Sequence, residues 1–435
     1  MPLRRTLTVV IGIVLIAAAC SSTGDDSDST GTAAADPESD ADVDTSTTSP
    51  ADDIAPFDLT GGATSSDEGV VIDADDPRSS LSPDAANASG RWVTDWTRST
   101  IDIGELAAGL GGSDTRDLIR PIDVPKFESI EAAALWLSAD EPGALVQIDD
   151  IVRFYPLSIL TRHEVVNDRF GDIPVAVTYC PLCNTALAFD RRVDGEVLRF
   201  GVSGLLRKSD LVMWDATTDS LWQQISGEGI VGTFAGTQLE VISTSIVSFG
   251  DFSESFPDGL SLSRDTGVGS GYGANPYAGY SSRTGPIAGF FQGDPDDRLP
   301  ALERVVGVTV GDELKAYPFS VIQTQPAIND EVGGEPIAVF WGGTTTDALD
   351  GVVIAESDQI GSGIAYERTV NGQVLTFTAN GDDTFTDAET STTWNLLGQA
   401  IDGELAGAQL EVAQHRNEFW FAFSGFFPDA DLYLA

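Results

Sequence analysis

Side chains that can bind a soft metal ion or exchange electrons are few in this chain, and they gather in one stretch. Cys180 and Cys183 form a Cys-Pro-Leu-Cys motif, His163 precedes it and Met213 follows it. A Cys-x-x-Cys pair can present two thiolates to one ion, and it can also open and close as a redox disulfide. The motif alone fits both kinds of chemistry, because two cysteines supply only half of a four-coordinate metal site.

A soft-metal site is the first of three interpretations. Thiolate, imidazole and thioether donors together suit copper, above all Cu(I), and zinc is the next choice. We therefore expect Cys180, Cys183 and His163 to hold copper or else zinc. Met213 is a further candidate ligand, although a methionine in an apolar run also fits core packing. The other histidine, His415, stands beside Arg416 and is expected at the surface.

Two other interpretations belong to different classes of protein. In one, Cys180 and Cys183 form the centre of a thiol–disulfide oxidoreductase. A thioredoxin-type unit needs a long helix that begins at the motif, whereas the turn signal Asp194–Gly195 follows soon after it, so such a centre would belong to another fold. In the other, the pair is an incidental disulfide in a non-enzymatic surface binding module. The reaction, if there is one, stays open at this point.

The segment that contains these residues is part of an internal sequence repeat. Residues 143–258 and 305–429 match in blocks, which include Val152–Pro156 with Leu314–Pro318, Asn167–Asp168 with Asn329–Asp330, Trp222 with Trp394, and Phe256–Asp258 with Phe427–Asp429. The chemically reactive residues are not repeated: His163 faces Gln325, Cys180 faces Gly342, Cys183 faces Thr345, and Met213 faces Phe385. Because both copies keep what the fold needs, residues held by one copy alone are candidates for function.

Each repeat reads mostly as β-strand. Short segments that are apolar or alternate between apolar and polar residues are separated by Gly and Asp. Asp194–Gly195 and Asn371–Gly372 are typical of two-residue hairpin turns. Helical turns are predicted over 156–162, and over 130–138 with Ser129 as the cap. We predict a mainly β fold with minor α content, made of two tandem homologous antiparallel β-rich repeats packed together.

The start of the chain has the pattern of an export signal. Arg4 and Arg5 precede a short apolar run, and small residues lead to Cys20. This order resembles a bacterial lipoprotein signal, in which the cysteine receives lipid and becomes the new N-terminus. The following residues are acidic and poor in apolar side chains, so they cannot offset the entropy of ordering. We expect an exported protein that Cys20 anchors, through membrane lipid, to the outer face of the cell membrane.

These patterns divide the chain into six segments. They are a lipoprotein signal peptide (1–20), a disordered acidic tether (21–90), an N-terminal extension that packs on the core (91–142), repeat 1 with the Cys-x-x-Cys motif (143–258), a loop-rich connector (259–304) and repeat 2 with a degenerate site (305–435). The formal net charge is −45 over 435 residues. Such a chain repels nucleic acid, because binding of nucleic acid depends on cations that neutralise phosphates.

Several motifs together resemble a known bacterial and archaeal family. They are Tyr155–Pro156, His163–Asp168, Val177–Ala186 with the Tyr-Cys-Pro-Leu-Cys core, Met213–Trp222, Asp123–Phe127 and Asn275–Tyr277. With these motifs the sequence resembles the domain of unknown function 3179 over nearly all of residues 90–435. One position departs from the family pattern: Trp214 stands where a tyrosine is common. The resemblance implies an exported globular protein with the motif in repeat 1, and it implies no particular reaction.

Overall fold

The computed structural model describes residues 61–73, 77–269 and 271–434. All of them belong to the second of two compact units, Pro56–Ala435, and the account below concerns that unit alone. The expected signal peptide, the lipidation site Cys20 and residues 21–60 of the expected tether lie outside the described residues.

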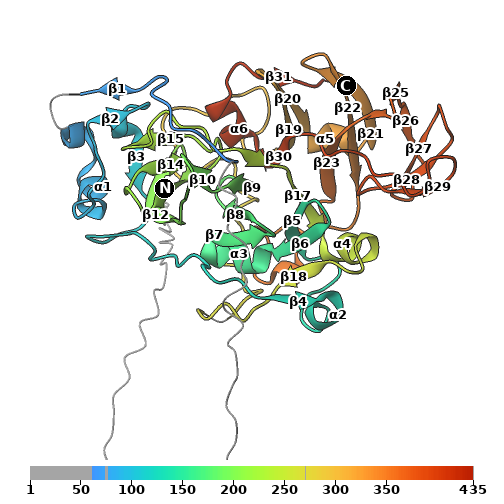
Figure 1. Ribbon diagram of the computed structural model, residues 1–435, viewed down its shortest axis with the longest axis horizontal. Helices are drawn as coiled ribbons and strands as arrows, with labels where there is room; N and C mark the ends of the chain where they lie inside the picture. Colours follow the sequence, from blue (N-terminus) through green and yellow to red (C-terminus); the bar gives the residue numbers. More distant parts are fainter. Residues whose placement is uncertain (1–60, 74–76, 270, 435) are drawn as a thin grey trace, which may run out of the picture. The chain divides into compact units, whose positions relative to one another are not determined.

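The described residues are mainly β, and repeat 1 contains three antiparallel arrangements of strands (Figure 1). The first sheet has the order β17-β5-β6-β18-β4, with β6 and β18 parallel, and the second has the order β16-β9-β8-β7. Strands β12 to β15 form the third. The elements are β5 (Pro142–Ile148), β6 (Ile151–Pro156), α3 (Leu157–His163), β7 (Val165–Phe170), β8 (Ile173–Cys180), β9 (Thr185–Asp190), β10 (Arg192–Val193), β11 (Glu196–Val197), β12 (Phe200–Arg207), β13 (Asp210–Asp215), β14 (Leu221–Gln223), β15 (Gly229–Val231), β16 (Val241–Ile242), β17 (Thr244–Ser248), α4 (Phe249–Ser255) and β18 (Leu260–Leu262).

Repeat 2 contains the same elements in the same order, except that β16 has no counterpart among its described strands, which confirms the predicted repeat arrangement. Its sheets are β30-β19-β20-β31, β21-β22-β23 and β26-β27-β28-β29. The elements are β19 (Arg304–Val310), β20 (Glu313–Pro318), α5 (Phe319–Ile322), β21 (Ala327–Val332), β22 (Glu335–Gly342), β23 (Ser362–Glu367), β24 (Thr369–Val370), β25 (Gln373–Val374), β26 (Phe377–Ala379), β27 (Thr384–Asp387), β28 (Thr393–Asn395), β29 (Ala400–Asp402), β30 (His415–Phe419), α6 (Trp420–Phe426) and β31 (Asp431–Leu432).

The residues that both copies keep make the same contacts in both. Trp222 Nε1 donates to Asp215 Oδ2 at 3.0 Å, and Trp394 Nε1 donates to Asp387 Oδ2 at 2.9 Å. The hairpin β10-β11 turns at Asp194 and Gly195, with φ of 52° and 78°, and its counterpart turns at Asn371 and Gly372, with φ of 52° and 79°. Positive φ at both central residues is the type I′ geometry that Asn-Gly and Asp-Gly favour. The shared residues therefore build the fold.

The last strand and helix of each repeat pack into the core of the other repeat. Phe419 and Phe421, from the end of repeat 2, lie in the core cluster that holds the two cysteines of repeat 1. Val247 and Phe249, from the end of repeat 1, lie in the core cluster of repeat 2. Strand β30 contacts β9, and β17 contacts β23. Side chains of each repeat are thus placed inside the other.

Part of the segment expected to be a disordered tether is folded, which corrects the predicted boundary at residue 90. Helix α1 begins behind Ser82, whose Oγ accepts the N–H of Ala85 at 3.2 Å. Leu81, Ala85 and Ala88 are buried in a cluster with two tryptophans of the extension, Trp92 and Trp96. The composition of residues 61–90 suggested disorder because it includes few apolar residues. These few residues are nevertheless buried, because they pack against the apolar surface of Trp92 and Trp96.

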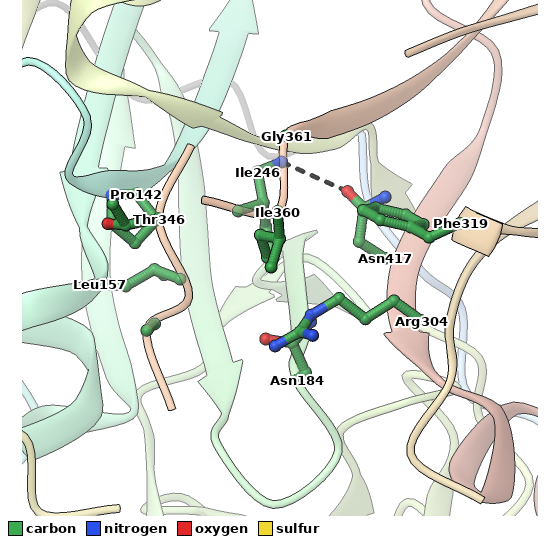
Figure 2. Close-up of a pocket in the computed structure, with 11 residues that line it drawn as sticks. Pro142, Leu157, Asn184, Ile246, Arg304, Phe319, Thr346, Ile360, Gly361 and Asn417 are labelled. Carbon is green, nitrogen blue, oxygen red and sulfur yellow. Dashed lines mark hydrogen bonds between the residues drawn. The ribbon is translucent and has the colours of Figure 1, made fainter. Parts of the chain in front are cut away.

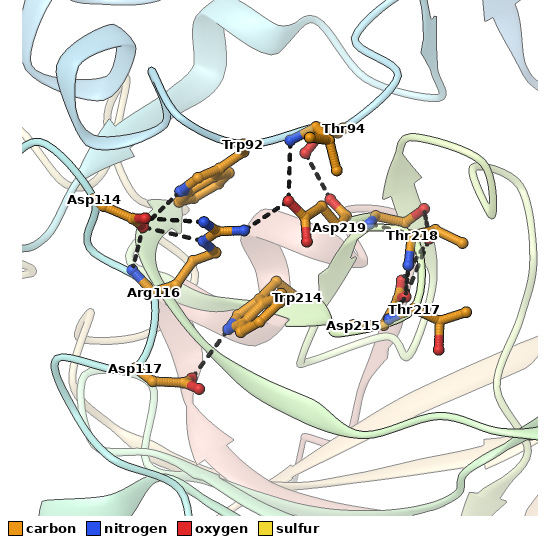
Figure 3. Close-up of polar contacts among 12 residues, drawn as sticks. Trp92, Thr94, Asp114, Arg116, Asp117, Trp214, Asp215, Thr217, Thr218 and Asp219 are labelled. Carbon is orange, nitrogen blue, oxygen red and sulfur yellow. Dashed lines mark hydrogen bonds and ion pairs between the residues drawn. The ribbon is translucent and has the colours of Figure 1, made fainter.

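The N-terminal extension adds strands and helices to repeat 1 and is fastened there by Arg116 (Figure 3). Its elements are β1 (Val71–Ile72), α1 (Pro83–Ala88), β2 (Arg98–Ser99), β3 (Leu106–Ala108), β4 (Phe127–Ser129) and α2 (Ile130–Ala133). The Arg116 guanidinium lies 5.7 Å from the ring centre of Trp92 and 5.1 Å from that of Trp214, and it pairs with Asp114 and Asp219 at 2.9 and 2.6 Å. Helix α2 is shorter than the predicted 130–138, although Ser129 caps it as expected.

Candidate functional site

The Cys-x-x-Cys motif forms the tight connection between β8 and β9. Cys180 ends β8, the N–H of Cys183 donates to the carbonyl of Cys180 at 3.2 Å, and β9 begins at Thr185. Asn184 has a φ of 55°, and its side-chain oxygen accepts a hydrogen bond from the Tyr179 hydroxyl at 3.1 Å. Both cysteines are free thiols, and both are buried. The turn places the two sulfurs on the same side, inside the core of repeat 1.

A carboxylate, Asp210, joins the two sulfurs. One ligand atom from each of Cys180, Cys183 and Asp210 lies within 4.8 Å of the others, and no other such group of cysteine, histidine and acidic side chains occurs in the described residues. Asp210 Oδ2 accepts hydrogen bonds from Gln223 Nε2 at 2.6 Å and from the N–H of Ile225 at 2.9 Å. Its Oδ1 has no hydrogen-bond partner among the described residues. These three side chains could hold a metal ion.

Several residues around this group have left-handed backbone conformations. Glu164, Asn184, Lys208 and Ser209 all have φ between 50° and 67°, a region that residues other than glycine rarely occupy. Lys208 and Ser209 directly precede Asp210, and Glu164 ends α3. At Lys208 and Ser209, the two central residues of the β12-β13 hairpin, positive φ is the type I′ geometry. The counterparts of Glu164 and Asn184 in repeat 2, Pro326 and Thr346, are not among the described residues with positive φ.

Two further carboxyl groups lie in the same buried region. Burial, together with the nearby Asp210, raises the pKa of Glu164 to about 8, although the Tyr277 hydroxyl donates to its Oε1 at 3.2 Å. Burial also raises the pKa of Glu418 to about 8, with Arg416 acting in the opposite sense and Asp210 in the same sense. Burial raises the pKa of Asp210 to about 6 against its hydrogen bonds from Gln223 and Ile225. Burial and mutual repulsion therefore make all three carboxyl groups harder to ionise at this point.

The thiols share the same environment. Burial raises the pKa of Cys180 and raises that of Cys183 well above the ordinary range, and the acidic neighbours Asp210, Glu164 and Glu418 add to these shifts. A reactive cysteine normally has a lowered pKa and some exposure, because the thiolate is the nucleophile. Without a bound cation the pair is therefore held as neutral thiols.

His163 does not bridge the two sulfurs, contrary to the sequence-based expectation. Its Nδ1 contacts the Arg120 carbonyl at 2.6 Å, and its Nε2 contacts the Tyr272 hydroxyl at 2.7 Å, so both ring nitrogens are used. The residue ends α3, where the left-handed Glu164 turns the chain into β7. As a result, the ring ties α3 to the extension and the connector. Asp210 takes the place beside the sulfurs that the sequence suggested for this imidazole.

Met213 lies in the core, as its apolar run allowed, whereas His415 is not at the surface as expected. Met213 is fully buried in the core that holds the cysteines, paired across the sheet with Val202 and Trp222. His415 was expected at the surface but is buried: its Nδ1 contacts the Ala413 carbonyl at 2.9 Å, and its Nε2 contacts Ser245 Oγ at 3.3 Å. Burial lowers the pKa of His415 to about 4. Pairing of β30 with β19 and packing against β17 cover it, which the adjacent arginine did not reveal.

In repeat 2, Gly342 and Thr345 take the places of Cys180 and Cys183, and two positions of the surrounding strands carry phenylalanine. The pairing of strands aligns Thr178 with Phe340 and Met213 with Phe385, and these two phenylalanine rings stack with centres 3.9 Å apart. The exposed Asp382 stands where repeat 1 has Asp210, beyond a shorter hairpin. The same fold therefore forms without thiols or buried acids at this point, as the comparison of the two copies suggested.

A small hollow lies beside the cysteine loop, between residues of both repeats (Figure 2). Asn184 and Leu157 line it from repeat 1, and Arg304 and Asn417 line it from repeat 2. Arg304 Nη2 pairs with Asp347 Oδ1 at 2.7 Å. The volume of about 20 Å³ accommodates a water molecule or a small ion and is too small for an organic ligand.

Three residues of this region were missed in the sequence: Glu164, Asp210 and Glu418. The signal that could have found two of them is again the duplication. Glu164 faces Pro326, and Glu418 of β30 occupies the position that Val247 occupies in β17, since each is the fourth residue of its strand. A polar residue in one copy opposite an apolar residue in the other marks a position where the fold does not require the polar side chain.

Comparisons with known proteins agree with the motifs. Among the described residues, no helix is long and apolar enough to cross a membrane. No curated protein and no solved structure matches the chain. The model of the family described as "Protein of unknown function (DUF3179)" matches residues 116–430, which is most of the chain. The chain therefore belongs to the DUF3179 family, as its motifs indicated.

Proposed function

We propose that this protein binds one divalent metal ion, with zinc as the preferred ion, through Cys180, Cys183 and Asp210. The observation that carries the proposal is the convergence of these three ligand atoms within 4.8 Å in a fully buried position. Ions with thiolate and carboxylate ligands at such distances are typical of zinc sites. The protein then acts in metal handling, or uses the ion in chemistry that its small neighbouring hollow limits to small molecules.

The electrostatics of the region support a cation. Two thiols and three carboxyl groups are buried together, and the nearest positive group that pairs with any of them is Arg416, whose Nε lies 3.6 Å from Glu418 Oε1. Burial of unpaired acidic groups costs several kcal/mol each. A divalent ion offsets that cost and gives Asp210 Oδ1, which lacks a hydrogen-bond partner among the described residues, a ligand role.

Zinc replaces copper as the first choice because the set of ligands differs from the expected one. With His163 turned to Arg120 and Tyr272, an oxygen ligand joins the sulfurs instead of an imidazole. Cu(I) favours soft sulfur and imidazole donors, whereas zinc accepts thiolate and carboxylate together.

Thiol–disulfide exchange is the second candidate, and one observation favours it: both thiols are free and their sulfurs lie within 4.8 Å of each other. Their burial and their raised pKa values argue against it, since exchange requires an accessible thiolate. Titration of the thiols with a disulfide reagent, without denaturant, separates the two candidates. Rapid reaction of both thiols in the metal-free protein, together with no bound metal, would favour exchange.

The decisive experiment is a metal titration of purified, metal-stripped protein. Co(II) is the probe, because thiolate ligation gives it intense absorption, and Zn(II) is then added in competition. We expect one ion per chain in the wild type and none in Cys180→Ser/Cys183→Ser. Asp210→Asn should weaken binding, while Asp382→Asn, its exposed counterpart in repeat 2, should not. Equal or absent binding in all four proteins would refute the proposal.

We also propose that the protein is exported and held on the outer face of the cell membrane by lipid on Cys20. The short apolar run and the small residues before Cys20 support this location. Cys20→Ala should move the protein from the membrane fraction to the soluble fraction. Retention of the variant in the membrane fraction would contradict the proposal.

A further inference from the structure

Strand β30 of repeat 2 delivers an acidic side chain, Glu418, into the core of repeat 1. The side chain is fully buried, and neither carboxylate oxygen has a hydrogen-bond partner among the described residues. The contact that it does make is the ion pair with Arg416, at 3.6 Å between Nε and Oε1. A buried carboxylate with two unsatisfied oxygens is costly to a folded protein, so its position calls for an explanation.

The backbone next to Glu418 is tied to the cysteine loop. The N–H of Phe419 donates to the carbonyl of Cys183 at 2.9 Å. Strand β30 also contacts β9, which begins two residues after Cys183. Glu418 thus stands one residue from a direct hydrogen bond between repeat 2 and the motif of repeat 1, and its carboxyl group contributes to the raised pKa of Cys183.

Arg416 does not depend on Glu418 as its partner. Its Nη1 donates to the Ile225 carbonyl at 2.9 Å, and its Nη2 donates to Thr309 Oγ1 at 3.3 Å. The guanidinium keeps these two hydrogen bonds when the carboxylate rotates away. The fold does not need an acid at this position either, because Val247 occupies it in the other repeat, inside an apolar core cluster.

We propose that Glu418 is the fourth protein ligand of the ion bound by Cys180, Cys183 and Asp210, so that the ion joins the two repeats. This inference rests on the proposed function. On binding, the Glu418 carboxylate turns from Arg416 to the ion and completes a four-coordinate set of two sulfurs and two oxygens, a number and mixture of ligands that suit zinc. Three ligands come from repeat 1, and the fourth comes from the copy that lacks a motif of its own.

The test compares Glu418→Gln with wild type and with Glu141→Gln. Glu141 is another buried carboxyl, but it accepts the N–H of Ser138 at 2.9 Å and has no place in the site. We expect Glu418→Gln to weaken Zn(II) binding at least about tenfold and to alter the Co(II) absorption spectrum. Glu418→Gln should leave the circular dichroism spectrum of the metal-free protein unchanged, so that weaker binding reports the loss of a ligand. Glu141→Gln should bind metal as wild type does.

The outcomes separate this inference from the function on which it rests. Wild-type affinity and an unchanged Co(II) spectrum in Glu418→Gln would overturn the ligand role and leave the metal site standing. Equal weakening of Zn(II) binding in Glu418→Gln and in Glu141→Gln would also overturn it, since the loss would then follow from a change at any buried carboxyl group. If the wild type itself binds no metal, the proposed function fails, and the inference fails with it.

Discussion

Acidification should destabilise this protein through one buried imidazole, that of His415. The residue is buried against Ser245 and the Ala413 carbonyl, and burial lowers its pKa from 6.5 to about 4, with the neighbouring Arg416 acting in the same sense. A histidine with a lowered pKa in the folded state binds its proton more readily when the chain unfolds. Its contribution to stability is therefore complete above pH 6.5 and is lost as the pH falls toward 4.

The size of this effect follows from the two pKa values. They differ by about 2.5, which corresponds to about 3.4 kcal/mol at about 1.36 kcal/mol for each pKa unit. At pH 5 about 2 kcal/mol of this is already lost. For a protein with a total stability of about 5–15 kcal/mol, such a loss is large.

The duplicated chain supplies the matched variant. Thr244 stands where repeat 2 has His415, and its Oγ1 contacts the Ile242 carbonyl at 3.1 Å, as His415 Nδ1 contacts the Ala413 carbonyl. His415→Thr therefore keeps the local hydrogen bond and removes the titration. The free energy of unfolding in urea should fall by about 3 kcal/mol more in wild type than in the variant between pH 7 and pH 4. Equal losses in both proteins would refute the reasoning.

Three shorter predictions concern the extension, the connector and a hairpin. Arg116→Met should lower the free energy of unfolding, measured in urea, by about 2 kcal/mol, because the partly buried Asp114 and Asp219 lose their ion-pair partner. An unchanged free energy of unfolding would mean that Arg116 does not hold the extension on repeat 1. Tyr280→Phe removes the hydrogen bond to the Leu182 carbonyl at 2.9 Å, which holds the connector over the cysteine loop. The cysteines of the metal-free protein should then react about fivefold faster with a disulfide reagent. An unchanged rate would mean that this hydrogen bond does not limit access to the cysteines. Gly372→Ala should cost about 1 kcal/mol in the same urea assay, because φ is 79° there, and no cost would argue against the type I′ turn.

The fold was largely predictable because its signals are local. Alternating strands and the pairs Asp194–Gly195 and Asn371–Gly372 specify hairpins within a few residues, and the duplication shows each signal twice. The folded part of residues 61–90 was missed because its apolar residues are few. These residues are buried against Trp92 and Trp96, and both tryptophans lie beyond residue 90, outside the segment whose composition suggested disorder.

The site was only half predictable, because its members meet through packing. The cysteines are adjacent in the chain, so the motif was visible, but Asp210 arrives from another sheet through the β12-β13 hairpin. His163 is closer in sequence than Asp210 yet is turned to Arg120 and Tyr272. Glu418 lies more than two hundred residues away and reaches the region because β30 and α6 pack against the core of repeat 1.

The two copies together indicate why buried acids at this point have a function. The corresponding strands β17 and β30 each pack against the other repeat. Val247 of β17 lies in an apolar core, whereas Glu418 of β30 is buried where it influences the pKa of Cys183. Apolar replacements of buried ionic groups are often neutral or stabilising, and repeat 2 shows that this fold accepts them here. A chain that keeps the costly set in one copy alone is expected to gain something other than stability from it, and the proposed cation would give these groups a common partner.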